Sequence, residues 1–333
     1  MNILLRTAGG ASEKYELGTG HIFRCINLTK KLNKHKIIFA VEDFGGVKQI
    51  LKQNNLTKIK FLKQDINENE DIKKITKIIY QEKIDLVIVD KFGIKKSYLR
   101  KLQKIITTVY ISDLLQYEFP VDLVINGFIG LKNERKKNNF GANCILGPKY
   151  QILSNTHLPK KQKKKYDLLI TLGGFDKNKI LNKLCKILPK YLDQLQIRVI
   201  LGPVTKKTKD IIKLEKEFPK TLSIIHYSKN IQKEIVNSKF GLCAGGITTY
   251  EFALHDVPFF ITCQYNHQKI TAEYWKKLEY CYDYILPNKK LEPVEIYLQK
   301  IINKKIIRKN RKIKIDHLGN TRVVKEILKL KII

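Results

Sequence analysis

The segment Phe240–Thr262, FGLCAGGITTYEFALHDVPFFIT, contains the full pattern of one strand–helix–strand unit. Apolar runs at 240–243 and 258–262 predict two buried strands, and residues 248–255 after the Gly-Gly loop predict a helix between them. Two parallel strands need a crossover of this kind. Short apolar runs that alternate with helices indicate a parallel sheet covered on both faces. The segment therefore predicts an α/β fold.

The same alternation extends along the chain in both directions. It predicts strands at 2–5, 36–41, 58–62, 84–90, 107–112, 121–126, 166–172, 196–201 and 221–225, and helices at about 20–32, 71–81, 95–104, 178–188, 231–237 and 269–278. One stretch, Ser154–Lys165 (SNTHLPKKQKKK), has a Pro, a Lys run and no apolar period, as linkers do. We therefore predict two Rossmann-like parallel-sheet domains, 1–153 and 166–333, joined by a linker at 154–165. They should face a central cleft, and a final helix at about 323–330 can return to the first domain.

Composition and charge narrow the class of protein. Of the 333 residues, 43% are hydrophobic, which is enough for packed cores and excludes wholesale disorder. Lys and Arg number 64 and Asp and Glu 31, so the formal net charge is +33. This leaves open a polyanionic partner, an anionic membrane surface, an anionic substrate or simply a solvated Lys-rich surface. Because the Lys residues are dispersed and no basic, aromatic-rich element concentrates them, we expect no specific nucleic-acid binding and only weak membrane-surface association.

The cysteines and the N-terminus bear on the compartment. The six Cys residues form no C-x-x-C pair, so neither a zinc ribbon nor a redox dithiol is predicted. Buried free thiols of a reducing compartment are expected. Residues 1–5 are strand-like without a cleavable signal pattern, and no apolar run approaches the ~20 residues of a spanning helix. We expect a cytoplasmic, monomeric protein.

The first loop whose residues could take part in catalysis or binding is Gly18-Thr19-Gly20-His21, followed by Arg24. It matches neither the dinucleotide nor the P-loop motif. Its glycines give backbone freedom directly before a helix, which places His21 in the first helical turn. The helix dipole disfavours an imidazolium there, so a neutral His21 could accept a proton. Arg24, one turn on, could meet a phosphate or carboxylate; the alternative is a capping His with an exposed Arg.

Two glycine loops in the second half resemble anion-binding turns. Gly173-Gly174 follows a strand, with Asp176 as a possible N-cap, and Gly245-Gly246 follows another. Glycine-rich strand–helix turns let backbone N–H groups approach a diphosphate. The second loop adds two hydroxyls and a carboxylate that can accept both ribose hydroxyls, namely Thr248, Thr249 and Glu251. The alternative is a capping box with Thr248 at the N-cap and Glu251 at N3.

Further polar residues stand at predicted strand ends. His267 and Gln268 belong to a polar loop after the strand at 258–262, and Asp90, Asp113 and Asn126 end three strands of the first half. Such residues either anchor loops or line a pocket. No strand-end loop carries D-x-D and no His/Cys cluster has ligand spacing, so we expect neither a metal nor a cofactor.

Taken together, these motifs resemble a known enzyme family. The Gly18-x-Gly20-His21-x-x-Arg24 signature is followed in order by VDKFG (89–93), LGPKY (146–150), TLGGFD (171–176) and CAGGITTYEFALHDVP (243–258). The chain is similar to the UDP-sugar hydrolase of pseudaminic acid biosynthesis and to spore-coat polysaccharide proteins described as predicted glycosyltransferases. Phe92 stands where the hydrolase has Tyr, and His267-Gln268 where it has an Asn-Gln pair. The His-Gln version is closer to transferases of the same fold.

The resemblance implies a GT-B-like fold, shared with the peptidoglycan transferase that adds N-acetylglucosamine to a lipid carrier. It implies a catalytic His21 and two sets of binding residues. UDP would contact Gly173, Gly174, Gly245, Gly246, Thr248, Thr249 and Glu251, and the sugar would contact Gly18, Gly20, Arg24, Asp90, Asn126, His267 and Gln268.

Three functions stay open at this point. The first is metal-independent hydrolysis of a UDP-amino-deoxy sugar, of the UDP-2,4-diacetamido-2,4,6-trideoxy-β-L-altropyranose type, to UDP and free sugar. The second is a GT-B glycosyltransferase in which His21 deprotonates an acceptor hydroxyl. The third is a polyanion- or membrane-surface-binding protein, for which the basic segment Asn303–Ile313 is the main argument.

Overall fold

The computed structural model describes residues 1–11, 17–154, 163–228, 230–306 and 313–332, and divides the chain into two compact units. Unit 1 comprises Met1–Ser12, Leu17–Asn155 and Asp316–Ile333, and unit 2 comprises Glu13–Glu16 and Thr156–Ile315. Most of the predicted linker (155–162) and much of the basic segment (307–312) lie outside the described residues. None of the described helices is long and apolar enough to cross a membrane.

Unit 1 is built on an eight-stranded sheet in the order β3-β2-β1-β4-β5-β6-β8-β7. All neighbours are parallel except β7, which pairs antiparallel with β8 at the edge. The strands are β1 (Asn2–Gly9), β2 (Lys36–Asp43), β3 (Ile59–Leu62), β4 (Leu86–Asp90), β5 (Thr108–Ile111), β6 (Leu123–Asn126), β7 (Glu134–Lys137) and β8 (Asn143–Leu146). The helices are α1 (Gly20–Thr29), α2 (Val47–Gln53), α3 (Glu68–Glu82), α4 (Lys96–Gln103) and α11 (Gly319–Ile327).

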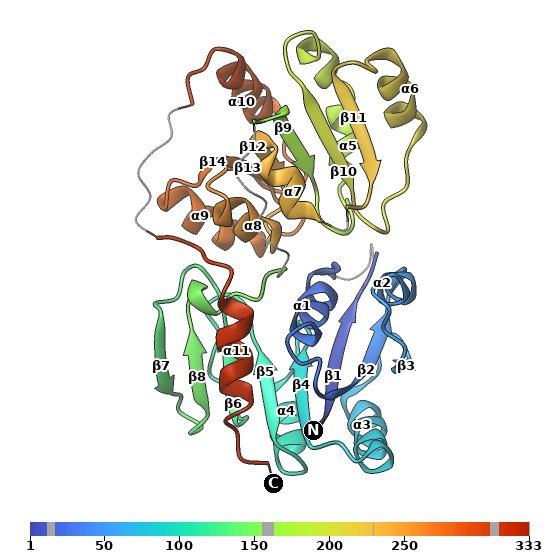
Figure 1. Ribbon diagram of the computed structural model, residues 1–333, viewed down its shortest axis with the longest axis vertical. Helices are drawn as coiled ribbons and strands as arrows, with labels where there is room; N and C mark the ends of the chain where they lie inside the picture. The colour runs from blue at the N-terminus through green and yellow to red at the C-terminus, as the bar shows by residue number, and fades with distance from the viewer. Residues whose placement is uncertain (12–16, 155–162, 229, 307–312, 333) are drawn as a thin grey trace. The chain divides into compact units, whose positions relative to one another are not determined.

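Alternation along the strands divides the core of unit 1 between two faces. Leu4, Val87 and Val89 pack with apolar residues of α3 and α4 on one face. Their strand neighbours, among them Thr7 and Asp90, therefore point to the other face. Helix α1 contacts β1 and α11 contacts α1, and Figure 1 shows both helices on the viewer's side of this sheet. The arrangement brings Asp90 to the same side as α1.

Unit 2 contains a six-stranded, all-parallel sheet in the order β11-β10-β9-β12-β13-β14. Its strands are β9 (Tyr166–Thr171), β10 (Ile197–Leu201), β11 (Leu222–His226), β12 (Ser238–Cys243), β13 (Phe259–Thr262) and β14 (Cys281–Ile285). Its helices are α5 (Ile180–Leu184), α6 (Lys209–Glu217), α7 (Ile231–Val236), α8 (Thr248–Leu254), α9 (Gln268–Lys277) and α10 (Glu292–Ile302). Helices α5, α6 and α10 share one apolar cluster with the sheet. The buried Trp275 of α9 packs edge-on against Tyr250 of α8 and Phe259 of β13.

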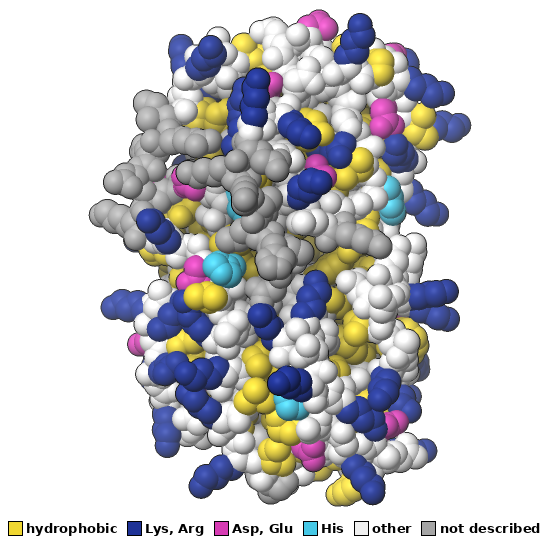
Figure 2. All heavy atoms as spheres, viewed as in Figure 1, with side chains coloured by type: hydrophobic (Ala, Val, Ile, Leu, Met, Phe, Trp, Pro, Cys, Tyr) yellow, Lys and Arg dark blue, Asp and Glu magenta, His cyan; other side chains and the backbone are white. Residues whose placement is uncertain are grey.

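The surface is rich in cations. Figure 2 shows Lys and Arg side chains scattered over the whole face in view, with a few acidic side chains among them. Some of the described lysines form ion pairs with neighbouring Asp or Glu, such as Lys36 and Lys60 with Glu82.

Candidate functional site

A histidine–aspartate pair lies at the carboxyl ends of the unit 1 strands. Helix α1 starts at Gly20 behind the N-cap Thr19, so His21 is in its first turn. Its Nδ1 lies 2.7 Å from Oδ1 of Asp90, which is fully buried at the end of β4. A carboxylate in this position favours a proton on Nδ1 and leaves the lone pair of Nε2 available as a base. The His21 side chain is 16% exposed, so the ring is still accessible.

Arg24 is buried and bonded to two carboxylates. Its Nε donates to Asp90 Oδ2 at 2.7 Å, and its Nη1 donates to Asp113 Oδ1 at 2.7 Å. Burial alone would lower the pKa of Arg24, but Asp113 and Asp90 outweigh this and raise it well above its ordinary value. Burial likewise would raise the pKa of Asp90, yet Arg24 and then His21 hold it below its ordinary value. Arg24 is therefore not the exposed arginine of the capping alternative, and a substrate contact through its guanidinium stays a prediction.

Asn126 is held by bonds within the protein. Asn126 is completely buried, and its amide donates to the backbone oxygens of Leu114 and Gln116 while its own oxygen accepts from the N–H of Phe128. It anchors the loop after β5 and does not bond to the His21 cluster. It is therefore the loop anchor that was one of the two alternatives for strand-end residues.

The glycines of the first loop act differently from the prediction. Neither Gly18 nor Gly20 has a positive φ, and a Cβ at either position would meet nothing within 4 Å, so they leave open space next to His21. Glycine is instead required at Gly10 for its conformation and at Gly9 for lack of space. Gly10 has φ +139°, and a Cβ on Gly9 would lie 2.7 Å from the Gly18 carbonyl. The sequence signal for this close approach is the Gly9-Gly10 pair at the end of β1.

In unit 2, two glutamines tie three strand-end loops together. The backbone N–H groups of Gln264 and Gly245 both donate to Gln268 Oε1, at 2.8 and 3.3 Å. Asn178 donates through its backbone N–H to Gln264 Oε1 and through its side chain to the Gln264 carbonyl. The loops after β9, β12 and β13 are therefore held at one edge of the sheet. Gln264 was not predicted as a site residue, because its role depends on contacts across strands.

Glu251 is a buried carboxyl group on the first turns of α8. The residue is 8% exposed, and burial raises its pKa from the ordinary value of 4.5 to about 8. The N-cap of α8 is Ile247, without a side-chain capping bond, so the capping box predicted as an alternative is absent. No hydrogen bond to the Glu251 side chain is found within the described residues. Thr249, in contrast, donates its hydroxyl to the Gly246 carbonyl at 2.7 Å.

The glycines of the two unit 2 loops differ in whether and why a larger residue would be disfavoured. Gly173 has φ +80°, which favours glycine, and Gly246 has open space where a Cβ would point. A Cβ on Gly245 would come within 2.9 Å of the Gln268 side chain. Asp176 accepts from the N–H groups of Ile180 and Leu181 in the first turn of α5. The N-cap residue of α5 is Lys179, so the prediction of Asp176 as the N-cap is wrong.

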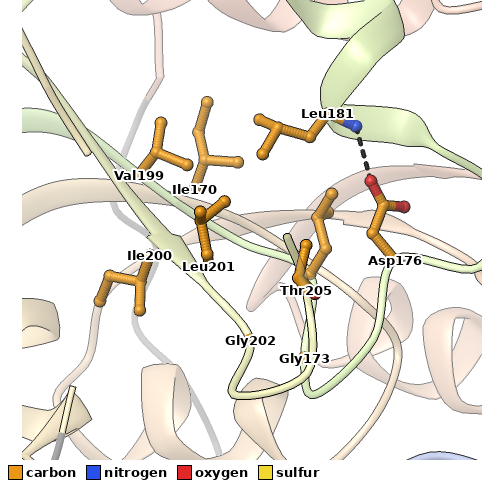
Figure 3. Close-up of a pocket in the computed structure, with 10 residues that line it drawn as sticks. Ile170, Gly173, Asp176, Leu181, Val199, Ile200, Leu201, Gly202 and Thr205 are labelled. Atoms are coloured by element: carbon orange, nitrogen blue, oxygen red, sulfur yellow. Dashed lines mark hydrogen bonds between the residues drawn. The ribbon is translucent and has the colours of Figure 1, made fainter. Parts of the chain in front are cut away.

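A small pocket lies beside the first glycine loop, at the ends of β9 and β10. Figure 3 shows apolar side chains such as Val199 and Leu201 around it, with Gly173 and Gly202 on neighbouring turns. The carboxylate of Asp176 points to the backbone N–H of Leu181 in this view and not into the pocket. The lining of this pocket is therefore mostly apolar.

His267 stacks on a buried tyrosine. The rings of His267 and Tyr265 are parallel within 8° with centroids 5.4 Å apart, and Lys177 lies over the Tyr265 ring. Within the part of the chain that the structure describes, no group of three or more His, Cys, Asp and Glu side chains is arranged to hold a metal ion. The six cysteines are free, and all except Cys185 are buried.

Comparison with known proteins gives relatives at low identity. The chain is 26% identical over 305 residues to the uncharacterized protein MJ1062 of Methanocaldococcus jannaschii, covering 84% of this chain but only 59% of that protein's length. It is 22% identical to the spore coat polysaccharide biosynthesis protein SpsG of Bacillus subtilis, covering 78% of this chain and 77% of SpsG.

Solved structures show the fold. MurG from Acinetobacter baumannii matches with a TM-score of 0.61 at 15% identity, covering 99% of this chain and 100% of MurG. A Staphylococcus aureus MnaA–UDP structure matches with a TM-score of 0.60 at 11% identity, covering 98% of this chain and 95% of that one. These similarities confirm the predicted GT-B-like α/β fold with two Rossmann-like parallel-sheet domains.

A family model, described as LpxB, lipid-A-disaccharide synthetase, matches residues 160–328, a range that contains all the described strand-end loops of unit 2. Since that range is just over half of the 333 residues, the chain belongs to the lipid-A-disaccharide synthetase (LpxB) family.

Proposed function

We propose that this protein is a glycosyltransferase that uses a UDP-sugar donor and an acceptor hydroxyl. The observation that carries the proposal is the hydrogen bond between His21 Nδ1 and the buried Asp90, at 2.7 Å. Such a pair orients the imidazole so that Nε2 can remove a proton from a hydroxyl group. The acceptor oxygen would then bond to the anomeric carbon as the bond to the diphosphate breaks, and UDP would leave.

The nucleotide part of the proposal rests on unit 2. Glu251 is a buried carboxyl group without a described partner, a state that is costly unless a ligand completes its hydrogen bonds. The open space beside Gly173 and Gly246 gives a phosphate room to approach the backbone of both loops. We propose that Glu251 accepts hydrogen bonds from the ribose and that Gly173, Gly174, Gly245, Gly246 and Thr248 surround the diphosphate.

The similar proteins support the choice of ligand. The MnaA structure contains UDP, and a UDP-GlcNAc 2-epimerase from Methanocaldococcus jannaschii, with a TM-score of 0.55 at 14% identity, was solved with UDP-GlcNAc and UDP. Membership of a family named after a disaccharide synthetase favours transfer to an acceptor over hydrolysis. We further propose that His267, on its Tyr265 support, contacts the sugar.

Hydrolysis is the second candidate. It is favoured by the Gly18-x-Gly20-His21-x-x-Arg24 signature, which resembles that of the UDP-sugar hydrolase of pseudaminic acid biosynthesis. The same His21–Asp90 pair could deprotonate water, and the substrate would then be a UDP-2,4-diacetamido-2,4,6-trideoxy-β-L-altropyranose type sugar. The relative SpsG, a spore coat polysaccharide biosynthesis protein, is compatible with either reaction.

A panel of UDP-sugars separates the two reactions. The protein is incubated with each donor, with and without sugar and lipid-linked acceptors, and UDP and the sugar product are measured by mass spectrometry. Transfer predicts UDP release that depends on the acceptor and a product with the acceptor's mass added. Equal UDP release without any acceptor, together with free sugar, would favour hydrolysis. Calorimetry with UDP tests the nucleotide site separately, and Glu251→Ala should weaken binding by about 1.5–3 kcal/mol.

A further inference from the structure

The arginine next to the candidate base creates an electrostatic problem. Arg24 Nη2 lies 3.1 Å from His21 Nδ1, and Arg24 is permanently charged. A cation at this distance opposes the uptake of a second positive charge by the imidazole. A base in this position therefore needs a compensating negative charge close by.

Asp113 supplies a negative charge beyond the one on Asp90. Its Oδ1 accepts from Arg24 Nη1 at 2.7 Å and its Oδ2 accepts from Arg24 Nη2 at 3.2 Å. The same Oδ2 lies 4.0 Å from His21 Nδ1, and the Asp113 side chain is 34% exposed. The cluster thus sets two carboxyl groups, Asp90 and Asp113, against one guanidinium, Arg24, which leaves one negative charge to balance a proton on His21.

The other titratable groups described near His21 do not change this count. Cys25 on α1 and Tyr110 on β5 interact with Asp90, and burial raises the pKa of both well above neutral. Both groups therefore stay uncharged at physiological pH. The charge that faces His21 comes from Asp90 on β4, Arg24 on α1 and Asp113 after β5.

We propose that Asp113 is a positioning residue for the base: it offsets the charge of Arg24 and thereby allows His21 to take up a proton. The inference rests on the proposed base role of His21. It assigns a function to a residue that the sequence marked only as a strand end. Asp90 orients the His21 ring and Arg24 holds Asp90 in place. Asp113 supplies the negative charge that offsets Arg24 when His21 takes up a proton.

The test follows the His21 ring directly. NMR of protein with labelled histidines gives the pH at which His21 takes up a proton, and His21→Asn identifies its signal. Asp113→Asn should shift that pH downward by roughly 0.5–1 unit, the size of a charge interaction at this distance near water. Arg24→Gln should shift it upward, because it removes the opposing cation. Asp113→Glu, which keeps the charge, should return it close to the parent.

Asp316→Asn is the matched control. Asp316 is a partly exposed aspartate of unit 1 that binds Arg322 through both oxygens, and it lies outside the His21 cluster. A shift in Asp113→Asn no larger than in Asp316→Asn would overturn the proposal. If Asp113→Asn does not fold, Asp113→Ser and Asp113→Glu form the same comparison of a lost and a retained charge.

Kinetics with the active donor complete the test. Asp113→Asn should lower kcat by roughly 10-fold with KM within about 3-fold of the parent, and the acid limb of the pH–rate profile should move to lower pH. A purely structural loss would lower kcat without moving the limb, and this result would contradict the proposal. Absence of turnover in the parent would refute the proposed function, while the NMR shift would still decide the role of Asp113.

Discussion

Glu251 carries a pH dependence that can be measured without any substrate. Burial raises its pKa from 4.5 to about 8, so the folded protein keeps a proton there that the unfolded chain has already lost. For an acid with a raised pKa, the stabilising effect is complete below the unfolded value and is lost as pH rises through the folded value. The parent should therefore lose stability between about pH 4.5 and pH 8.

Glu251→Gln removes this loss, because the amide resembles the protonated acid and cannot ionise. We expect the difference in unfolding free energy between Glu251→Gln and the parent to grow in favour of the variant by about 2–4 kcal/mol from pH 5 to pH 9. Urea denaturation at several pH values measures it, with the half-exposed Glu273→Gln as the control. Parallel pH profiles for the parent and Glu251→Gln would show that Glu251 is ionised in the folded state.

At the scale of loops and strands, Gln268 is predicted to act through its oxygen. Its Oε1 accepts from the backbone of Gln264 and Gly245 and joins the loops after β13 and β12. Gln268→Leu removes the acceptor and should weaken UDP binding roughly 5- to 20-fold, as expected for two buried N–H groups left unpaired. Gln268→Glu keeps an accepting oxygen and should bind UDP more tightly than Gln268→Leu. Calorimetry that ranks Gln268→Glu below Gln268→Leu would instead point to a direct contact through the amide nitrogen.

Helix α11 is predicted to be an integral part of unit 1. Asn320 is 1% exposed, and its side chain donates to the carbonyls of Asn27 and Leu153. Asn320→Ala should lower the unfolding free energy by about 1–3 kcal/mol, because two buried carbonyls lose a partner. Chemical denaturation measures this, with the exposed Lys325→Ala as a control that should change little. Equal stability of Asn320→Ala and Lys325→Ala would mean that α11 only rests on the surface.

Most strands of both sheets could be predicted from the sequence, because buried parallel strands consist of short runs of apolar residues. The predicted strand at 166–172 is β9, Tyr166–Thr171, and the predicted helix at 71–81 lies within α3, Glu68–Glu82. The edge strand β7, Glu134–Lys137, was missed because the sequence ERKK has no apolar residue. The start of α11 was placed too late, since Gly319 and Asn320 are polar or small yet buried by tertiary contacts.

Only the loops of the candidate site could be predicted from the sequence, and not the contacts between them. The motif around His21 and the glycine loops marked the strand ends, and the structure places Asp90 against His21. The hydrogen bonds of Arg24 to Asp90 and Asp113 could not be predicted, because the bonded residues are 66 and 89 positions apart in the sequence. A buried ion network was missed for the same reason. It joins Arg6, Glu42, Asp71 and Lys91 on the opposite face of the unit 1 sheet.

For the whole molecule, the net charge of +33 predicts non-specific binding to polyanions. The cations are spread over the face in view in Figure 2, and some of them pair with carboxylates, so binding to any polyanion should be weak and strongly salt-dependent. Filter binding or anisotropy with heparin and several nucleic acids, at about 50 and 200 mM salt, should show similar affinities that fall together. A sequence-selective, sub-micromolar complex that persists at the higher salt would contradict this prediction.

If His21 is the base of a UDP-sugar reaction, His21→Asn should abolish most of the activity and leave the nucleotide site intact. The amide keeps a polar side chain of similar reach but cannot take up the proton, so kcat for UDP release should fall by about 10²–10⁴-fold. The UDP affinity of the variant, measured by calorimetry on the same preparation, should stay within about 3-fold of the parent, because His21 is not part of the proposed nucleotide site. UDP release by His21→Asn at the parent rate would contradict the role of His21 as the base and leave it with a structural role.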